Sequence, residues 1–215
     1  MQWASLFLVL ASVACHQSPP AVEEHPAVIE EHPVSWLNPS DQALMDAATA
    51  GFQGKDPETL WLKKSDSPTI LKCQGDITGV ALFTPLRSAQ FLGYDNRKHF
   101  ENAPTLSDLT KKRYSASVYI FYGASRPDDE ASVAVSAGGT IFKPKDAHLG
   151  TPEVISCGEY LSPMWSLSVE ADFGGQDALP TSGKGTLIVR RSGKEDANID
   201  IDFDSIPTSF TAPQQ

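Results

Sequence analysis

The sequence predicts an α+β fold, in which N-terminal helices are followed by a mainly antiparallel β-sheet that forms a sandwich or an open barrel. Two observations predict this class. Helix start signals, each an Asn, Asp or Thr in front of a proline, occur at three places before residue 112. After residue 114 the apolar runs become short and are separated by turns containing Gly, Pro or Ser, which is typical of antiparallel strands.

Two helices are expected in the first part of the folded region. Asn38 is a good N-cap and precedes a proline, so a helix is predicted over residues 42–50 and ends at Gly51. Asp56, again in front of a proline, predicts a second and shorter helix that includes residues 60–62.

A longer helix is expected over residues 85–100, because Thr84 is an N-cap residue in front of a proline. Apolar residues in this segment share one helical face; these are Leu86, Ala89 and Leu92. Gly93 weakens the helix by about 1 kcal/mol relative to Ala. Thr105 and Asp108 have the spacing of a capping box, which predicts a turn or short helix next.

Strands account for most of the remaining sequence. Residues 117–122 contain an unbroken apolar run, which predicts a strand that is buried on both faces. Two further segments flank Ala137-Gly138-Gly139 as a hairpin. The predicted strands are 69–73, 79–83, 117–122, 132–136, 140–143, 166–173, 185–191 and 198–204.

An apolar run at the N-terminus ends directly before Cys15, and the segment LASVAC resembles the lipobox of bacterial lipoproteins. The resemblance implies a signal peptide over residues 1–14, acylation of Cys15, and an exported protein held on a membrane of the cell envelope. The lipobox is atypical, because Ser12 stands where Leu is usual and residues 1–3 carry no basic side chain. The alternatives are an ordinary signal peptide, with Cys15 a free thiol, and a cytosolic start.

Residues 15–35 are predicted to be a linker between this anchor and one globular domain, residues 36–215. The linker is rich in Pro and Glu and repeats the motif EEHP, at residues 23–26 and 30–33. Prolines this frequent exclude helix and strand alike. No metal ligand set is assigned to it, because nothing rigid would hold its two histidines.

Acylation of Cys15 leaves an even pair of cysteines, Cys73 and Cys157. An oxidising compartment outside the cytoplasm favours a disulfide between them. The alternative is two buried free thiols, which pack as small apolar residues.

A second resemblance covers residues 80–122. A strand, then Thr84-Pro85-Leu86-Arg87 opening a helix, then a basic stretch ending at Arg113 and an apolar strand, is similar to uncharacterised bacterial secreted proteins. The resemblance implies no particular activity.

The net charge of −10 makes nucleic acid and anionic lipid poor general partners of the whole chain. Basic residues nevertheless outnumber acidic ones over residues 87–113. This stretch is a candidate partner-facing basic patch, and the alternative is a solvated helix face. Its members are Arg87, Arg97, Lys98, Lys111, Lys112 and Arg113.

No catalytic residue, cofactor or metal is assigned from the sequence, which contains no G-x-S-x-G, S-x-x-K, HExxH, P-loop or dinucleotide motif. Asp200, Asp202 and Asp204 resemble the opening of a calcium loop, but Ser205 stands where that loop needs glycine. Their alternation with large apolar residues favours a strand with one solvated face.

Eight aromatic side chains line either a ligand groove or the core, and the core is favoured for most of them. They are Trp36, Trp61, Phe83, Phe91, Tyr119, Phe121, Tyr122 and Trp165.

The sequence therefore predicts a lipid-anchored envelope protein that acts as a non-catalytic binding or structural module. Its expected partners are the membrane, through the lipid, and an envelope protein or polymer. The alternative is a secreted hydrolase with an unrecognised site, in which His99 or His148 acts as general base.

Overall fold

A computed structural model of the chain describes residues 33–57, 59–158 and 164–210, all of which belong to one compact unit. The predicted signal peptide, Cys15 and the linker up to residue 32 lie outside the described residues. Among the described residues, no helix has the length and apolar character that crossing a bilayer requires.

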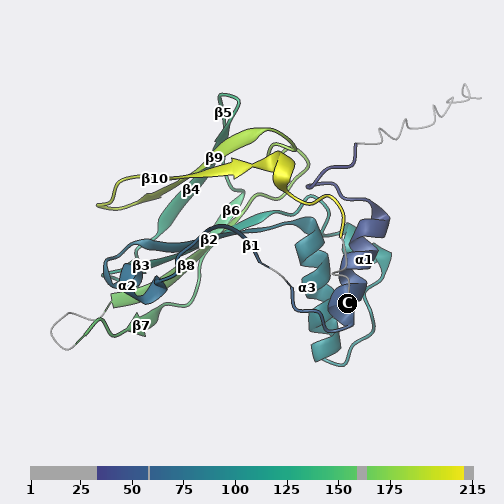
Figure 1. Cartoon of the computed structure of the whole chain (residues 1–215), viewed down its shortest axis with the longest axis horizontal. Coiled ribbons are helices and arrows are strands. Elements are labelled where there is room, and N and C mark those ends of the chain that lie inside the picture. The colour runs from purple at the N-terminus through teal and green to yellow at the C-terminus, as the bar shows by residue number, and fades with distance from the viewer. Residues whose placement is uncertain (1–32, 58, 159–163, 211–215) are drawn as a thin grey trace, which may run out of the picture. The chain divides into compact units, whose positions relative to one another are not determined.

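Two antiparallel sheets form the larger part of the described chain (Figure 1). The six-stranded sheet has the order β1-β2-β3-β8, and both β6 and β7 pair with β8. Its strands are β1 (Leu60–Lys64), β2 (Ile77–Phe83), β3 (Ser117–Ala124), β6 (Asp146–Leu149), β7 (Glu153–Ile155) and β8 (Met164–Asp172). The four-stranded sheet has the order β10-β9-β4-β5. Its strands are β4 (Ala131–Ala137), β5 (Thr140–Phe142), β9 (Lys184–Arg191) and β10 (Ala197–Asp202).

The two sheets pack face to face, so the fold is α+β with a sandwich and is not a closed barrel. Alternate residues of the strands point into the space between the sheets, as the two-residue period requires. On β3 the inward residues are Val118, Ile120 and Tyr122, each with no exposed surface. Trp36 joins this core, and its Nε1 donates to the Pro180 carbonyl at 3.0 Å.

The strand interpretation of the acidic alternation is confirmed. Ile199 and Ile201 of β10 are buried, whereas Asp200 and Asp202 are exposed. A 3₁₀ turn, η1 (Phe203–Ser205), follows the strand. β10 is an edge strand of its sheet, and a row of charges on an edge discourages pairing with another chain.

The predicted hairpin is also confirmed, as β4 and β5. Gly138 and Gly139 between them have φ angles of +55° and +80°. Two consecutive residues in this left-handed region form the turn that matches the twist of the strands, and glycine adopts it without a steric cost.

A separate apolar cluster lies between the helices α1 (Asp41–Phe52), α3 (Pro85–Lys98) and α4 (Leu106–Thr110). α1 and α3 lie side by side (Figure 1), and two glycines allow their backbones to meet. A Cβ on Gly93 would lie 2.0 Å from the Ala48 carbonyl oxygen, and a Cβ on Gly51 would lie 2.0 Å from that of Gln90. α1 extends through Gly51 to Phe52, so the predicted end of the helix at Gly51 is wrong by one residue.

The N-cap residues predicted for α3 and α4 are correct, and the one predicted for α1 is not. Thr84 caps α3, accepting from the Arg87 amide at 3.3 Å, and Thr105 with Asp108 forms the capping box of α4. The predicted cap Asn38 is wrong. Ser40 caps α1 and accepts from the Ala43 amide at 3.2 Å.

Two short elements are the reverse of the prediction. The expected helix around residues 60–62 is the strand β1, and the expected strand over 69–73 is the helix α2 (Pro68–Cys73). Leu60 and Leu62 both contact the core while Trp61 points away, which is a strand pattern. Proline at the first position of α2 is typical of a helix start. The short apolar run that follows it was interpreted as a strand, because a run of this length suits either element.

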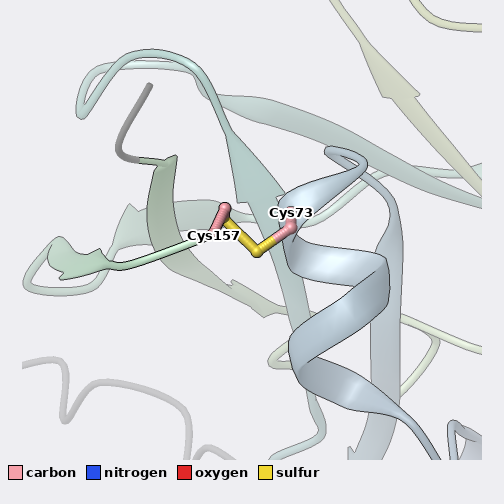
Figure 2. The surroundings of a disulfide bond; sticks show 2 residues. All are labelled: Cys73 and Cys157. Carbon is pink, nitrogen blue, oxygen red and sulfur yellow. A yellow bond between two sulfur atoms is a disulfide. The ribbon is translucent and has the colours of Figure 1, made fainter. Parts of the chain in front are cut away.

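The predicted disulfide is present. Figure 2 shows Cys73, the last residue of α2, bonded to Cys157, which lies shortly after β7. The two Cα atoms are 5.5 Å apart. The bond connects α2 to the segment that follows β7, an edge strand that lies outside the strands predicted from the sequence.

Candidate functional site

The outward face of the six-stranded sheet, called here the outer face, carries large aromatic side chains. On β3, the residues between the core positions are Tyr119 and Phe121, and both are half-buried. Trp61 on β1 shares this face and is 39% exposed. A solvated sheet face is normally polar, so aromatic residues here are informative about function.

These side chains form two groups of ring contacts, which β3 places on the same face through Phe121 and Tyr119. The ring centroids of Trp61 and Phe121 are 5.9 Å apart, and those of Tyr119 and Phe83 are 5.4 Å apart. Phe83, at the end of β2, meets Phe91 of α3 at 6.4 Å. We call this set the aromatic row; it consists of Trp61, Phe121, Tyr119, Phe83 and Phe91.

Small residues on β2 make room for the row. Gly79 and Ala81 lie on the outer face, opposite Phe121 and Tyr119 of β3. A Cβ on Gly79 would lie 2.8 Å from Cζ3 of Trp61 and 3.6 Å from Cδ2 of Phe121. The two rings therefore lie directly over this glycine, and its missing side chain positions Trp61.

Polar side chains continue the outer face on the far side of β3. Ser168 of β8 is paired with Phe121, and Glu170 is paired with Tyr119. His148 of β6 is in turn paired with Glu170, and its Nε2 lies 3.2 Å from a carboxylate oxygen of Asp146. We call Ser168, Glu170 and His148 the polar row.

A hydrogen bond joins the two rows. The hydroxyl of Tyr119 donates to the carboxylate of Glu170. Burial raises the pKa of Tyr119 well above its ordinary value, and the hydrogen bond and negative charge of Glu170 raise it further. Tyr119 therefore stays protonated at physiological pH and presents a hydroxyl donor to the Glu170 carboxylate on the neighbouring strand.

The six residues of the predicted basic patch differ in exposure and in their partners. Arg87 is only 8% exposed, lies 5.6 Å from the centre of the Phe83 ring and donates to Gln90 Oε1 at 3.1 Å. The prediction that Arg87 faces a partner is therefore wrong, because its side chain is buried against Phe83 of β2 and Gln90 of the next turn of α3. Arg113 pairs with Asp41. Arg97, Lys98, Lys111 and Lys112 are exposed near the ends of α3 and α4.

The two histidines of the folded part belong to different elements and have different carboxylate partners. His99 follows α3, and its Nδ1 is 3.4 Å from the Asp95 carboxylate; His148 belongs to the polar row. Both side chains are exposed. Within the described parts of the chain, no group of three or more His, Cys, Asp or Glu side chains is arranged to hold a metal ion.

The expectation that most of the aromatic residues lie in the core is correct for Trp36 and Tyr122, and Trp165 packs against the core from β8. It is wrong for the aromatic row. The signal was present on β3, where Tyr119 and Phe121 alternate with Val118 and Ile120. Aromatic and aliphatic residues that alternate in this way occupy opposite faces of a strand.

A scan of protein-family models finds no match to the chain, and a comparison with curated proteins finds no similar sequence. The chemistry of the outer face is therefore inferred from its own residues.

Proposed function

We propose that this protein is a lipid-anchored, non-catalytic module of the bacterial cell envelope that binds an envelope glycan on the outer face of its larger sheet. The observation that carries the proposal is the aromatic row, which lies on the solvent side of the sheet beside a row of hydroxyl, carboxylate and imidazole groups.

The anchor is supported by the lipobox-like segment that ends at Cys15 and by the Pro- and Glu-rich stretch behind it. The Cys73–Cys157 disulfide is compatible with an oxidising compartment. An acylated Cys15 would hold the domain at the membrane, and the linker would allow it to reach material in the envelope.

The chemistry of the two rows suits sugars. A pyranose ring presents an apolar face of C–H groups, which packs on a flat aromatic ring such as Trp61. Its hydroxyls need partners that both donate and accept. The Glu170 carboxylate accepts, and the Ser168 hydroxyl and the His148 imidazole do both.

The shape of the site favours a polymer over a single sugar. The aromatic row runs across β1, β3 and β2 to α3, and the polar row runs across β8 and β6. A ligand in contact with both rows spans several strands, each about 4.8 Å from the next. Several weak stacking contacts along a chain then add to a useful affinity.

The first experiment tests the anchor. We expect the natively exported protein to have an intact mass equal to residues 15–215 plus acyl groups, and this mass to rise by two protons on reduction of the disulfide. Replacement of Cys15 by serine is the matched control and should abolish the acyl mass. A mass that begins at Met1, without acyl groups, would overturn the envelope assignment.

The second experiment tests the binding face. The acylated protein in detergent is mixed with insoluble cell-wall glycan and the bound fraction is measured against protein concentration. We expect Trp61→Ala to weaken binding by roughly 30-fold, because a central aromatic contact is worth about 2 kcal/mol. Gly79→Ala should weaken binding in the same direction, since the new Cβ displaces the Trp61 ring without changing its chemistry.

Ile141→Ala is the control for exposed apolar surface, because Ile141 is 51% exposed on β5 of the other sheet. It should bind as the wild type does. Circular dichroism of all three variants establishes that they are folded. Unchanged binding by both Trp61→Ala and Gly79→Ala, or retention of proteins but no glycan, would refute the proposed ligand.

A further inference from the structure

The end of α3 carries an aromatic side chain in an unusual position. Phe100 is the first residue beyond the C-cap His99, it has a φ of +60°, and 98% of it is exposed. Glycine is the usual residue at this place, because a Cβ is strained in the left-handed region. The protein therefore bears both a backbone cost and an exposed apolar ring.

The turn that contains Phe100 is held by backbone and side-chain hydrogen bonds. The Phe100 amide donates to the Arg97 carbonyl at 3.1 Å, and the Glu101 amide donates to the Asn96 carbonyl at 2.8 Å. These two bonds form a Schellman motif. The Asn96 side chain also donates to the Asn102 carbonyl at 2.9 Å. The ring is thus held outward by a defined structure, and backbone strain of this kind points to a function.

Basic side chains surround this turn. Lys98 lies in the last turn of α3, and Lys111 and Lys112 line the same surface depression as Asn96 and Glu101. Asp108, on the rim of this depression, is engaged by Thr105 at 2.7 Å and by Lys111 at 3.5 Å. Four basic residues lie around the turn against three acidic ones, an excess of one positive charge in a protein whose net charge is −10. The basic residues are Arg97, Lys98, Lys111 and Lys112, and the acidic ones are Asp95, Glu101 and Asp108.

We infer that the tip of α3 docks on an anionic phospholipid surface, with Phe100 entering the boundary between headgroups and acyl chains and Lys98, Lys111 and Lys112 beside the phosphates. The inference rests on the lipid anchor of the proposed function, which would keep the domain next to such a surface. A lipid chain and a basic, aromatic contact together are the two signals that stable membrane attachment requires. The glycan-binding face plays no part in it.

The test uses the acylated full-length protein in vesicles of phosphatidylglycerol and phosphatidylethanolamine. A nitroxide label on Asn102→Cys reports depth through its collisions with a water-soluble nickel complex and with oxygen. The native cysteines are acylated or in the disulfide, so only the new thiol reacts. Val154→Cys, on β7 and 61% exposed at the native residue, carries the control label.

We expect the label at 102 to lose contact with the nickel complex and gain contact with oxygen, while the label at 154 stays in water. Phosphatidylcholine vesicles should weaken the effect. Phe100→Gly should return the label at 102 to water and at the same time raise the melting temperature, because glycine relieves the left-handed strain. Loss of docking in a more stable protein cannot be attributed to unfolding.

The outcomes separate the two proposals. Protein that carries no acyl group and does not enter the vesicles would overturn the anchor and this inference with it. Acylated protein in vesicles whose label at 102 is as hydrated as that at 154 would overturn the docking alone. Spin–spin broadening between labels at 102, without a change of depth, would assign the Phe100 tip to contact with a second copy and would also overturn the membrane contact.

Discussion

Replacement of Cys73 and Cys157 together by serine is expected to lower the free energy of unfolding by about 4 kcal/mol. The disulfide closes a loop with a sequence separation of 84 residues, and loop-closure entropy in the unfolded chain gives about 4.5 kcal/mol for that length. Both residues are partly exposed in the fold, so serine fits without a buried polar cost. Because the bond constrains the unfolded chain, the described contacts need not change.

The measurement is a urea titration followed by circular dichroism, comparing the double variant with the wild type. Wild type treated with a reductant should coincide with the double variant, since both lack the same bond. Cys15→Ser should match the oxidised wild type, because Cys15 is not part of the bond. An unchanged midpoint in the double variant would mean that the unfolded chain is already constrained by other contacts.

Replacement of Arg191 by methionine is expected to cost about 3 kcal/mol, the second large effect. Arg191 ends β9 and is 8% exposed. Its Nη1 donates to the carbonyls of Gly75 at 2.8 Å and Gly123 at 3.2 Å, and its guanidinium lies 5.0 Å from the centre of the Tyr122 ring. One side chain therefore connects β9 to the turn after α2 and to the end of β3.

The cost arises because methionine fills the space but donates no hydrogen bonds. Two buried carbonyls lose a charged donor, and the contact with Tyr122 loses its cation–π component. The measurement is again a urea titration. Arg190→Met is a matched control on the neighbouring residue, since Arg190 is exposed on the other face of β9 and pairs with Asp196 at the surface.

Arg190→Met should leave the unfolding midpoint unchanged within error, because exposed ion pairs contribute little to stability. Arg191→Lys should recover only part of the loss, since an ammonium lacks the planar fork that reaches both carbonyls. Equal effects of Arg190→Met and Arg191→Met would contradict the assignment of Arg191 as the connection between the sheets.

Local patterns in the sequence were sufficient for most of the fold. The alternation of Ile199 and Ile201 with Asp200 and Asp202 predicted β10, and the two glycines at 138 and 139 predicted the hairpin. Both signals act within a few residues, through the strand period and the φ range of glycine. The predicted pairing of Cys73 with Cys157 is correct. It followed from the number of cysteines, once Cys15 was set aside as the expected acylation site.

The secondary structure of two short elements was predicted incorrectly. Residues 60–64 and 69–73 carry apolar side chains at spacings that both helix and strand accept. β1 is a strand because β2 offers it a hydrogen-bonding edge, and α2 is a helix covering the end of the larger sheet, where a Cβ on Gly123 would lie 1.8 Å from the Lys72 carbonyl oxygen. In both segments, contacts with other parts of the chain decide between helix and strand.

The sequence by itself determined the fold class, the longer helices and strands, and the cysteine pair. These depend on short-range periodicity, on capping residues and on the number of cysteines. Only the tertiary structure decided which aromatic residues face solvent, that Arg87 and Arg191 are buried while Arg190 is not, and that Phe100 is held outward. The physical reason is that burial depends on what packs against a face, and those partners come from segments far away in the sequence.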